Sequence, residues 1–396
     1  MDQHSGETGQ AISDDEADLT PIELLRTQGP LPRGSALGPS VLAVALSILC
    51  FFSVLAFRFP QYLTTPDLRH GYDVEMLRKV LFGALVVAGA LAFVNLLRGR
   101  RWQLNLIALS LIGISAALGG SAVEVKDFPD HTPYIGLDLF VIDLLTTAAV
   151  FIVLEKLFAQ DREQPIFRIG WQLDLGYFFS NDLIVGAVLL VVNTVTRSTL
   201  KWVPTGGVQG WVSNLPLYVA VPLAMLVADL SQYWVHRANH QVKPLWRMHA
   251  VHHSTEAMDW MSGSRLHIGE ILQVRIFVIL PILALGFSKA SVDIYVLIVS
   301  TQSVFIHSNM RTGLGPLKYI LATPNFHHWH HSQDAEGIDK NYAAHFSFLD
   351  YLFGTAAKAE RKWPLRYGVL GNYVPQNFLG QVKFPFRRPI YAAHPE

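Results

Sequence analysis

The chain has 396 residues, of which 51% are hydrophobic and only 16% are charged, and its formal net charge is zero. Soluble domains are about one quarter charged, so this composition argues against two soluble domains and predicts a polytopic membrane protein with no nucleic-acid partner. Since Cys50 is the only cysteine, the sequence excludes an intrachain disulfide and thiolate metal sites.

The first third of the chain predicts a tail followed by membrane helices. Residues 1–35 are polar and acidic with little periodicity, and we expect them to be a disordered tail. Residues 36–134 contain three apolar runs, each of about the length that a bilayer core requires. These runs are 39–57, 80–97 and 102–119.

Five further apolar runs lie within residues 135–358, namely 135–158, 171–196, 212–235, 268–287 and 290–309. The last two are expected to form a hairpin, because the turn 286–289 separates them, and Pro281 is expected to kink the first. Residues 359–396 form a basic tail that we expect in the cytoplasm or at the membrane surface. The predicted fold is all-α, a transmembrane helical bundle.

Histidines are concentrated late in the chain, where twelve of the sixteen lie between His236 and His345. Eight of them form the patterns HxxxH, HxxHH and HxxHH. Histidines spaced by three and four residues share one face of a helix, so three helical segments can direct their imidazoles into one space. The eight are His236, His240, His249, His252, His253, His327, His330 and His331.

Neutral imidazole is the commonest metal ligand, and eight imidazoles exceed what one metal uses, so the pattern implies two metals. Single histidines near a membrane surface are usually only hydrogen-bonded, but three clusters in a chain poor in charge are not explained in that way. On ligand type alone, either iron or zinc fits an all-nitrogen site.

The three histidine clusters must lie on one side of the membrane if they form one site. Counting apolar runs back from His236 places the loops 98–101 and 159–170 and the N-terminus on that same side. Both loops are basic, so the positive-inside rule makes this side cytoplasmic, although the basic loop 58–79 opposes the assignment. We therefore expect a cytoplasmic, histidine-rich helical cap.

The order and spacing of the histidine patterns, with an apolar hairpin before the last, resemble the fatty acid hydroxylase/sterol desaturase superfamily. Further matches are PLWRMHAVHHS at 244–254, RLHIGE at 265–270, FIHSN at 305–309, DKNY at 339–342 and FLDYLFGT at 348–355. Two positions depart from the family pattern, with Ile268 in place of proline and Ala343 in place of a frequent glycine.

The resemblance implies that residues 135–358 are a membrane catalytic domain and that the eight histidines bind two irons. It also implies an O2-dependent hydroxylase or desaturase acting on a C–H bond of a sterol, a fatty acyl chain or a related membrane lipid. Because no flavin, haem or nicotinamide fingerprint is present, electrons are expected from a ferredoxin, a cytochrome b5-like protein or a reductase.

Seven other residues are candidates for additional ligands or for groups that orient the ligands. By resemblance, His267 and His307 are possible ligands; His328 and His345 flank the core pattern, and His328 is expected to pack beside it. Asn309 and Asn341 could hydrogen-bond ligand imidazoles. Asp229 lies two helical turns before His236, where it either supports a ligand or lines a wet cleft.

Two alternatives remain open at this stage. The chain could be a zinc-binding membrane protein or a metal transporter without oxygenase activity. The aromatic residues around the histidines could be an interfacial belt or the lining for a lipid tail. They are Tyr233, Trp234, Trp246, Trp260 and Trp329.

Overall fold

The structure is a computed structural model that describes residues 37–125, 134–181, 184, 207–312, 314–357 and 362–387. These residues form helices, turns and loops, with two isolated β-bridges and no β-strand among them. The all-α prediction is confirmed for this part of the chain. The predicted tail 1–35 and much of the predicted run 171–196 lie outside it.

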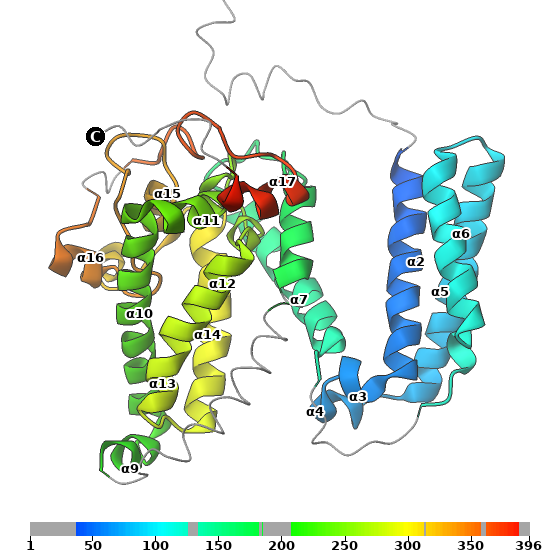
Figure 1. Cartoon of the computed structure of the whole chain (residues 1–396), viewed down its shortest axis with the longest axis horizontal. Helices are drawn as coiled ribbons and strands as arrows, with labels where there is room; N and C mark the ends of the chain where they lie inside the picture. Colours follow the sequence, from blue (N-terminus) through cyan, green and yellow to red (C-terminus); the bar gives the residue numbers. More distant parts are fainter. Residues whose placement is uncertain are drawn as a thin grey trace, which may run out of the picture. The chain divides into compact units, whose positions relative to one another are not determined.

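Figure 1 labels the elements along the chain. The longer helices are α2 (Leu37–Arg58), α5 (Val74–Leu97), α6 (Trp102–Ala117), α7 (Leu137–Leu157), α10 (Leu217–Gln241), α11 (Lys243–His253) and α14 (Lys289–His307). The shorter elements are α3 (Pro60–Leu63), α4 (Pro66–Arg69), η2 (Gly120–Ala122), α9 (Val208–Ser213), η4 (Ser262–Ser264), α12 (Ile268–Val274), η5 (Arg275–Ile279), α13 (Leu280–Ala284), η6 (Gly315–Tyr319), α15 (Pro324–His330), α16 (Phe348–Phe353), α17 (Phe378–Lys383) and η7 (Phe384–Phe386). Residues 171–181 are also helical.

The chain divides into two compact units, one of Met1–Pro60 with Gly71–Asp127 and the other of Gln61–His70 with Phe128–Glu396. In the first unit, α2, α5 and α6 pack against one another. Their contacts include the small buried side chains of Ala43, Ala92 and Ala108, which allow helix backbones to approach closely.

Five helices are long and apolar enough to cross a membrane: Val74–Leu97, Trp102–Ala122, Leu137–Leu157, Leu217–Gln241 and Lys289–His307. They correspond to five of the eight apolar runs predicted from the sequence. The first run falls in α2, whose apolar part, Leu42–Arg58, is shorter than these five.

The predicted hairpin is present in the second unit, where the segment α12–η5–α13 descends beside α10 and α14 returns (Figure 1). Its core includes Ala224 and Ala228 of α10, packed with Ile282 and Tyr295 of the hairpin. The descending segment is not one regular helix. A π-helical turn, Arg275–Ile279, ends two residues before Pro281, where proline removes a backbone donor from the helical ladder.

Helix α10 is shifted toward the C-terminus relative to the predicted run 212–235, because it begins at Leu217 and continues to Gln241. His236 and His240 therefore lie inside its last turns. Helix α14 ends at His307, and the short helices α11 and α15 contact these helix ends. The histidine-bearing segments consequently meet at one end of the second unit.

Candidate metal centre

The first cluster of imidazoles, called here the five-histidine group, joins three helices. Its members are His236, His240, His249, His253 and His330, all buried. One ring nitrogen from each lies within 4.8 Å of those of the others. The Nε2 atom of His249 is 3.0 Å from Nε2 of His236 and 3.0 Å from Nε2 of His253.

The second cluster, called here the four-histidine group, contains His252, His307, His327 and His331, again buried and within 4.8 Å of one another. The Nε2 atom of His307 is 3.3 Å from that of His252 and 3.0 Å from that of His327. The Nε2 atoms of His327 and His331 are 3.1 Å apart. All eight histidines of the sequence pattern thus lie in the two groups, and His307 is the ninth member.

Hydrogen bonds of the outward-facing Nδ1 atoms show which nitrogen of each ring carries the proton. The Nδ1–H of His236 donates to the carbonyl oxygen of Tyr342 at 2.7 Å, and that of His307 donates to Ser303 at 2.7 Å. The Nδ1–H of His252 donates to the carbonyl oxygen of Arg265 at 3.2 Å. Since a carbonyl oxygen can only accept, these three neutral rings present unprotonated Nε2 lone pairs to the interior.

Unprotonated nitrogens that face each other repel unless a cation lies between them. His252 and His307 face each other in this way, with Nε2 atoms 3.3 Å apart. Two nitrogens each about 2.1 Å from one metal lie about 3.0–3.4 Å apart at coordination angles of about 90–109°. The buried Nε2 of His330, whose Nδ1–H donates to the carbonyl of Lys340 at 2.7 Å, has no hydrogen-bond partner among the described residues. Both groups therefore fit a bound metal ion.

Burial also keeps the rings in the ligand-competent form. Desolvation, followed by the neighbouring imidazoles, lowers the pKa values of His249, His253, His327 and His331 well below the ordinary histidine value. Neutral imidazole is the form that binds metals. The groups therefore do not have to lose protons near neutral pH before they bind.

Two carboxylates contact the outer nitrogens of the five-histidine group. The Nδ1–H of His249 donates to Oε1 of the buried Glu270 at 2.7 Å, and the Nδ1–H of His240 donates to Oδ1 of Asp339 at 3.0 Å. Such partners orient an imidazole and increase its basicity. Both residues lie within the stretches RLHIGE and DKNY, but no pattern in the sequence predicts this role for them.

The segment 339–342 supplies three of these outer contacts, from positions 339, 340 and 342. The side chain of Asp339 accepts from His240, and the carbonyl oxygens of Lys340 and Tyr342 accept from His330 and His236. Asp339 and Asn341 adopt positive φ angles of 54° and 58°, a conformation that Asp and Asn tolerate better than most residues. The alternating backbone directs the two carbonyls toward the histidines.

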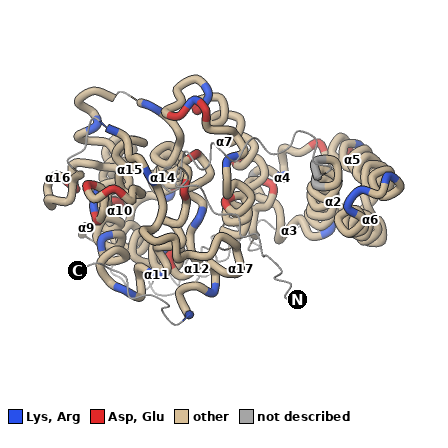
Figure 2. Tube along the Cα trace, turned by 90° about the horizontal axis from the view of Figure 1, so that it is seen from above, with Lys and Arg blue, Asp and Glu red and all other residues tan. Residues whose placement is uncertain are grey.

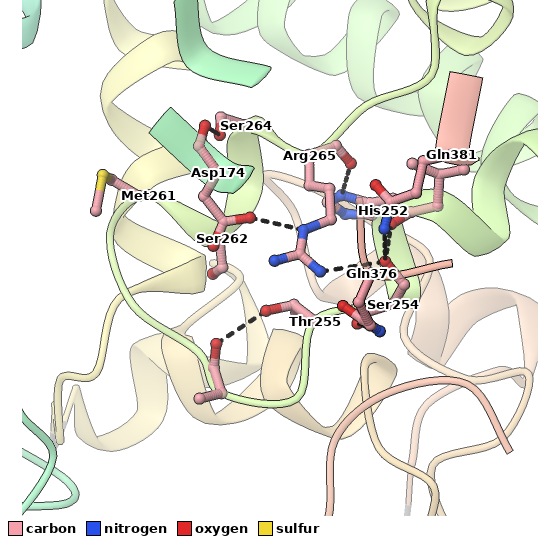
Figure 3. Close-up of polar contacts among 12 residues, drawn as sticks. Asp174, His252, Ser254, Thr255, Met261, Ser262, Ser264, Arg265, Gln376 and Gln381 are labelled. Carbon is pink, nitrogen blue, oxygen red and sulfur yellow. Dashed lines mark hydrogen bonds and ion pairs between the residues drawn. The ribbon is translucent and has the colours of Figure 1, made fainter. Parts of the chain in front are cut away.

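The buried Arg265 orients one member of the four-histidine group through its backbone carbonyl. Figure 3 shows the guanidinium of Arg265 between Asp174 and Ser254. Its Nε–H donates to Oδ1 of Asp174 at 2.6 Å, and a terminal N–H donates to Oγ of Ser254 at 3.2 Å. The carbonyl oxygen of Arg265 accepts from His252. Asp174 also accepts from Arg168 at 2.7 Å, so the backbone that orients His252 is held by paired charges.

The C-terminal segment 362–387 packs against the histidine segments. The amide of Gly368 donates to the carbonyl oxygen of His331 at 3.2 Å. The side-chain amide of Gln381 donates to Oγ of Ser254 at 3.0 Å (Figure 3). Helix α17 and η7 lie beside α11 (Figure 1). This part of the predicted tail 359–396 therefore belongs to the cap around the histidines.

His267 and His328 do not join either group, because both nitrogens of each ring face protein atoms. His267 Nδ1 accepts from the amide of Gly269 at 3.1 Å, and its Nε2–H donates to the carbonyl oxygen of Val382 at 3.1 Å. His328 Nε2–H donates to the carbonyl oxygen of Ser308 at 3.1 Å, and its Nδ1 is 2.9 Å from the hydroxyl of Tyr367. Neither ring lies in the two groups, and His328 lies beside them, with its Nε2 facing the carbonyl oxygens of His307 and Ser308.

Asp229 does not support a ligand as predicted. Its fully buried carboxylate accepts from the backbone amides of Ala344, His345 and Phe346 at 2.9, 3.1 and 2.6 Å. It therefore fixes the loop that follows segment 339–342. The sequence predicted either a partner for a ligand or a residue lining a wet cleft, and Asp229 has neither role. His345 is buried in that loop and lies outside both groups, with its ring against Tyr295.

The two asparagines also bind backbone rather than imidazoles. Asn309 Nδ2–H donates to the carbonyl oxygen of Asp161 at 2.9 Å, and its Oδ1 accepts from the Asp161 amide at 2.9 Å. Asn341 Nδ2–H donates to the carbonyl oxygen of Phe326 at 2.7 Å, and its Oδ1 accepts from the amide of Ala357 at 2.8 Å. Both positions stabilise loops around the site, so the predicted contacts with ligand rings are wrong.

The family model for fatty acid hydroxylase matches residues 221–355, which include all nine grouped histidines. This part of the chain, about a third of its length, is therefore similar to the fatty acid hydroxylase family. The matched segment runs from within α10 to just past the end of α16, so it contains the hairpin and both histidine groups. The contacts made by residues 362–387 lie beyond it.

Several curated proteins are similar to part of the chain. The ornithine lipid hydroxylase OlsE of Rhizobium tropici is 31% identical over 182 residues, which cover 45% of this chain and 54% of that protein. The alkylglycerol monooxygenase of Homo sapiens is 34% identical over 132 residues, covering 33% and 29%. The very-long-chain aldehyde decarbonylase GL1-5 of Oryza sativa subsp. indica is 26% identical over 205 residues, covering 48% and 30%.

The matches thus span about half, or less, of the length of these relatives. No solved structure matches the chain.

Proposed function

We propose that this protein is an O2-dependent membrane lipid hydroxylase that holds two iron ions in its two histidine groups. The observation that carries the proposal is the pair of buried groups, in which neutral imidazoles present unprotonated nitrogens to each other. The superfamily match and the relatives named as hydroxylases and monooxygenases support an oxidative reaction.

Iron fits the proposal better than zinc because zinc has no redox chemistry. Bound iron would supply the activation of O2 that oxidises a C–H bond. The side chains of this chain hold and orient the ligands and keep water from the ligand set. Glu270 and Asp339 orient rings of the five-histidine group, whereas backbone carbonyls orient His252 and His307 in the other group.

The proposed substrate is a membrane lipid attacked close to its headgroup. The histidine groups lie at the ends of α10 and α14, whereas transporters place their polar ligands near the middle of the membrane. The relatives named for ornithine lipid and alkylglycerol support a lipid with a polar head and an acyl or alkyl chain. We place the metal groups and the N-terminus on the cytoplasmic side.

In this proposal the domain 135–358 carries the reaction, with residues 36–134 as additional membrane helices. The tail 359–396 contributes to the cap through its contacts with Ser254 and His331. Electrons come from an external donor. Hydroxylation is proposed over desaturation because two of the three relatives described above are named as a hydroxylase and a monooxygenase.

Metal analysis of the purified full-length protein, combined with O2 uptake in the presence of lipid, tests the proposal. We expect two irons per chain and uptake that depends on lipid and reductant. Zinc without turnover would contradict the proposal and support the zinc-protein alternative. Lipid profiles of a deletion strain and its parent would identify the substrate as the lipid that accumulates and lacks one hydroxyl group.

A variant separates the metal centre from membrane insertion. His252→Ala is expected to abolish hydroxylation and to lower the iron content while the protein still inserts into the membrane. Normal turnover in this variant would remove His252 from the site.

A further inference from the structure

The surface formed by α11 and the end of the C-terminal segment carries basic residues and no acidic ones. Helix α11 has the sequence KPLWRMHAVHH, and α17 with η7 reads FLGQVKFPF. Residues 361–395 contain six Lys and Arg and no Asp or Glu. The side chains of Lys243, Lys383 and Arg387 are exposed. In a chain of zero net charge, this region is a local excess of positive charge.

Arg247 holds the two elements together. Its guanidinium donates to the carbonyl oxygens of Phe384, at 3.1 Å, and Arg387, and it lies 5.8 Å from the centroid of the Phe384 ring. Lys243 lies four residues before Arg247, on the same face of α11. We call Lys243, Arg247, Lys383 and Arg387 the basic strip. Figure 2 shows Lys and Arg along the edge of the molecule beside α11 and α17.

Trp246 connects this surface to the five-histidine group. Its indole ring lies 5.0 Å from the ring of His240 and 5.5 Å from that of His253, between ring centroids. Its Nε1–H donates to the hydroxyl of Tyr373 at 2.9 Å. The ring of Tyr373 lies 5.9 Å from that of Phe384, which Arg247 covers. Ring contacts and one hydrogen bond therefore connect the basic strip to the five-histidine group.

We propose that the basic strip docks an acidic one-electron carrier protein, which delivers electrons to the five-histidine group across Trp246 and Tyr373. This inference rests on the proposed function. Hydroxylation follows R–H + O2 + 2e⁻ + 2H⁺ → R–OH + H2O, so each turnover oxidises two carrier molecules by one electron each. The carrier is external because the sequence shows no flavin, haem or nicotinamide fingerprint.

An acidic protein fits the strip better than a membrane surface does. Anionic lipids also attract Lys and Arg, and the exposed ring of Phe386 could enter a bilayer. A membrane contact, however, gives no role to the aromatic path that leads from the strip to His240 and His253. Complementary charge guides a carrier to the point where this path reaches the surface, and it raises association rates in a salt-dependent way.

The test uses a triple variant, Lys243→Glu with Lys383→Glu and Arg387→Glu, in the full-length iron-loaded protein. Arg247 is kept because it joins the two elements. The rate of iron reduction is measured with reduced plant-type [2Fe–2S] ferredoxin at low and high salt. We expect the second-order rate constant at low salt to fall about tenfold or more and to lose its salt dependence. Arg162→Glu, in the exposed loop near Asn309, is the matched control and retains the wild-type rate.

Three measurements make the result specific. The iron content and the rate of reduction by methyl viologen radical, a small cation, are not lowered in the triple variant. Titration with oxidised ferredoxin reports docking without any redox step, and the variant is expected to bind more weakly. Wild-type ferredoxin binding and reduction in the variant would overturn the proposal.

Loss of binding to anionic lipid vesicles with unchanged ferredoxin kinetics would also overturn the proposal, since the strip would then contact the membrane. If methyl viologen reduces no centre in the wild type, the proposed redox function fails. In that case the ferredoxin titration still decides whether the strip docks a carrier.

Discussion

Replacement of Glu270 by glutamine tests how the five-histidine group is tuned. The carboxylate is buried, and its Oε1 accepts from Nδ1–H of His249 at 2.7 Å. Its other oxygen has no hydrogen-bond partner among the described residues. Glutamine keeps the shape of the side chain but removes the negative charge that favours a cation on the far side of the imidazole. The substitution therefore changes charge with little change in packing.

The expected effect has opposite signs with and without metal. Loss of such an outer partner typically lowers metal affinity about 10–100-fold, which corresponds to about 1.4–2.7 kcal/mol. In the metal-free protein, however, burial raises the pKa of Glu270 to about 8, so its charged form is costly near neutral pH. The metal-free Glu270→Gln protein is therefore expected to unfold at the same temperature as the parent or at a higher one.

The assay combines iron binding at buffered free-metal concentrations with thermal unfolding of metal-free protein in detergent. Asp339→Asn is the matched control. It also removes a carboxylate that accepts from a grouped histidine, but the Asp339 side chain is 44% exposed and solvent screens its charge. A smaller loss of affinity is expected there. Unchanged iron affinity in Glu270→Gln, or marked destabilisation of its metal-free form, would refute the reasoning.

Three other outcomes follow from the contacts. His307→Ala is expected to reduce bound metal from two ions to one per chain, whereas His328→Ala retains both, and metal analysis distinguishes them. Asp174→Asn removes the buried carboxylate partner of Arg265, at an expected cost of about 3–5 kcal/mol measured by denaturant unfolding; an unchanged midpoint would contradict it. Chelation of the metal is expected to lower the unfolding temperature of the parent protein, because facing lone pairs then repel, and resupply of iron should restore it.

The eight predicted histidines come together because their spacing is a local property of helices. HxxxH lies in α10, the first HxxHH in α11 and the second in α15 with the residue after it, so each pattern presents one face. His307 carries no such signal. It is a single histidine at the end of α14, and it joins a group only because that helix end packs against α15. Its place in the four-histidine group therefore depends on tertiary packing and not on local spacing.

The outer partners were harder to predict because most of them are backbone atoms. Carbonyl oxygens of Arg265, Ser303, Lys340 and Tyr342 accept from grouped histidines, and no residue type marks a carbonyl as an acceptor. Asp229 was predicted as a carboxylate partner only because it lies two helical turns before His236 on α10. Its carboxylate instead meets the loop amides of residues 344–346, which come from far along the chain.

The two departures from the family pattern have local explanations. Ile268 stands where the family has proline, at the first position of α12, where the missing amide hydrogen of proline would cost no helical bond. Ala343 stands where glycine is frequent, but the positive φ angles of this loop fall at Asp339 and Asn341. The amide of Ala343 donates to Oδ2 of Asp350 at 2.8 Å, in a backbone conformation that does not require glycine. The carbonyls that orient His330 and His236 therefore depend on the Asp and Asn of DKNY rather than on the residue that follows it.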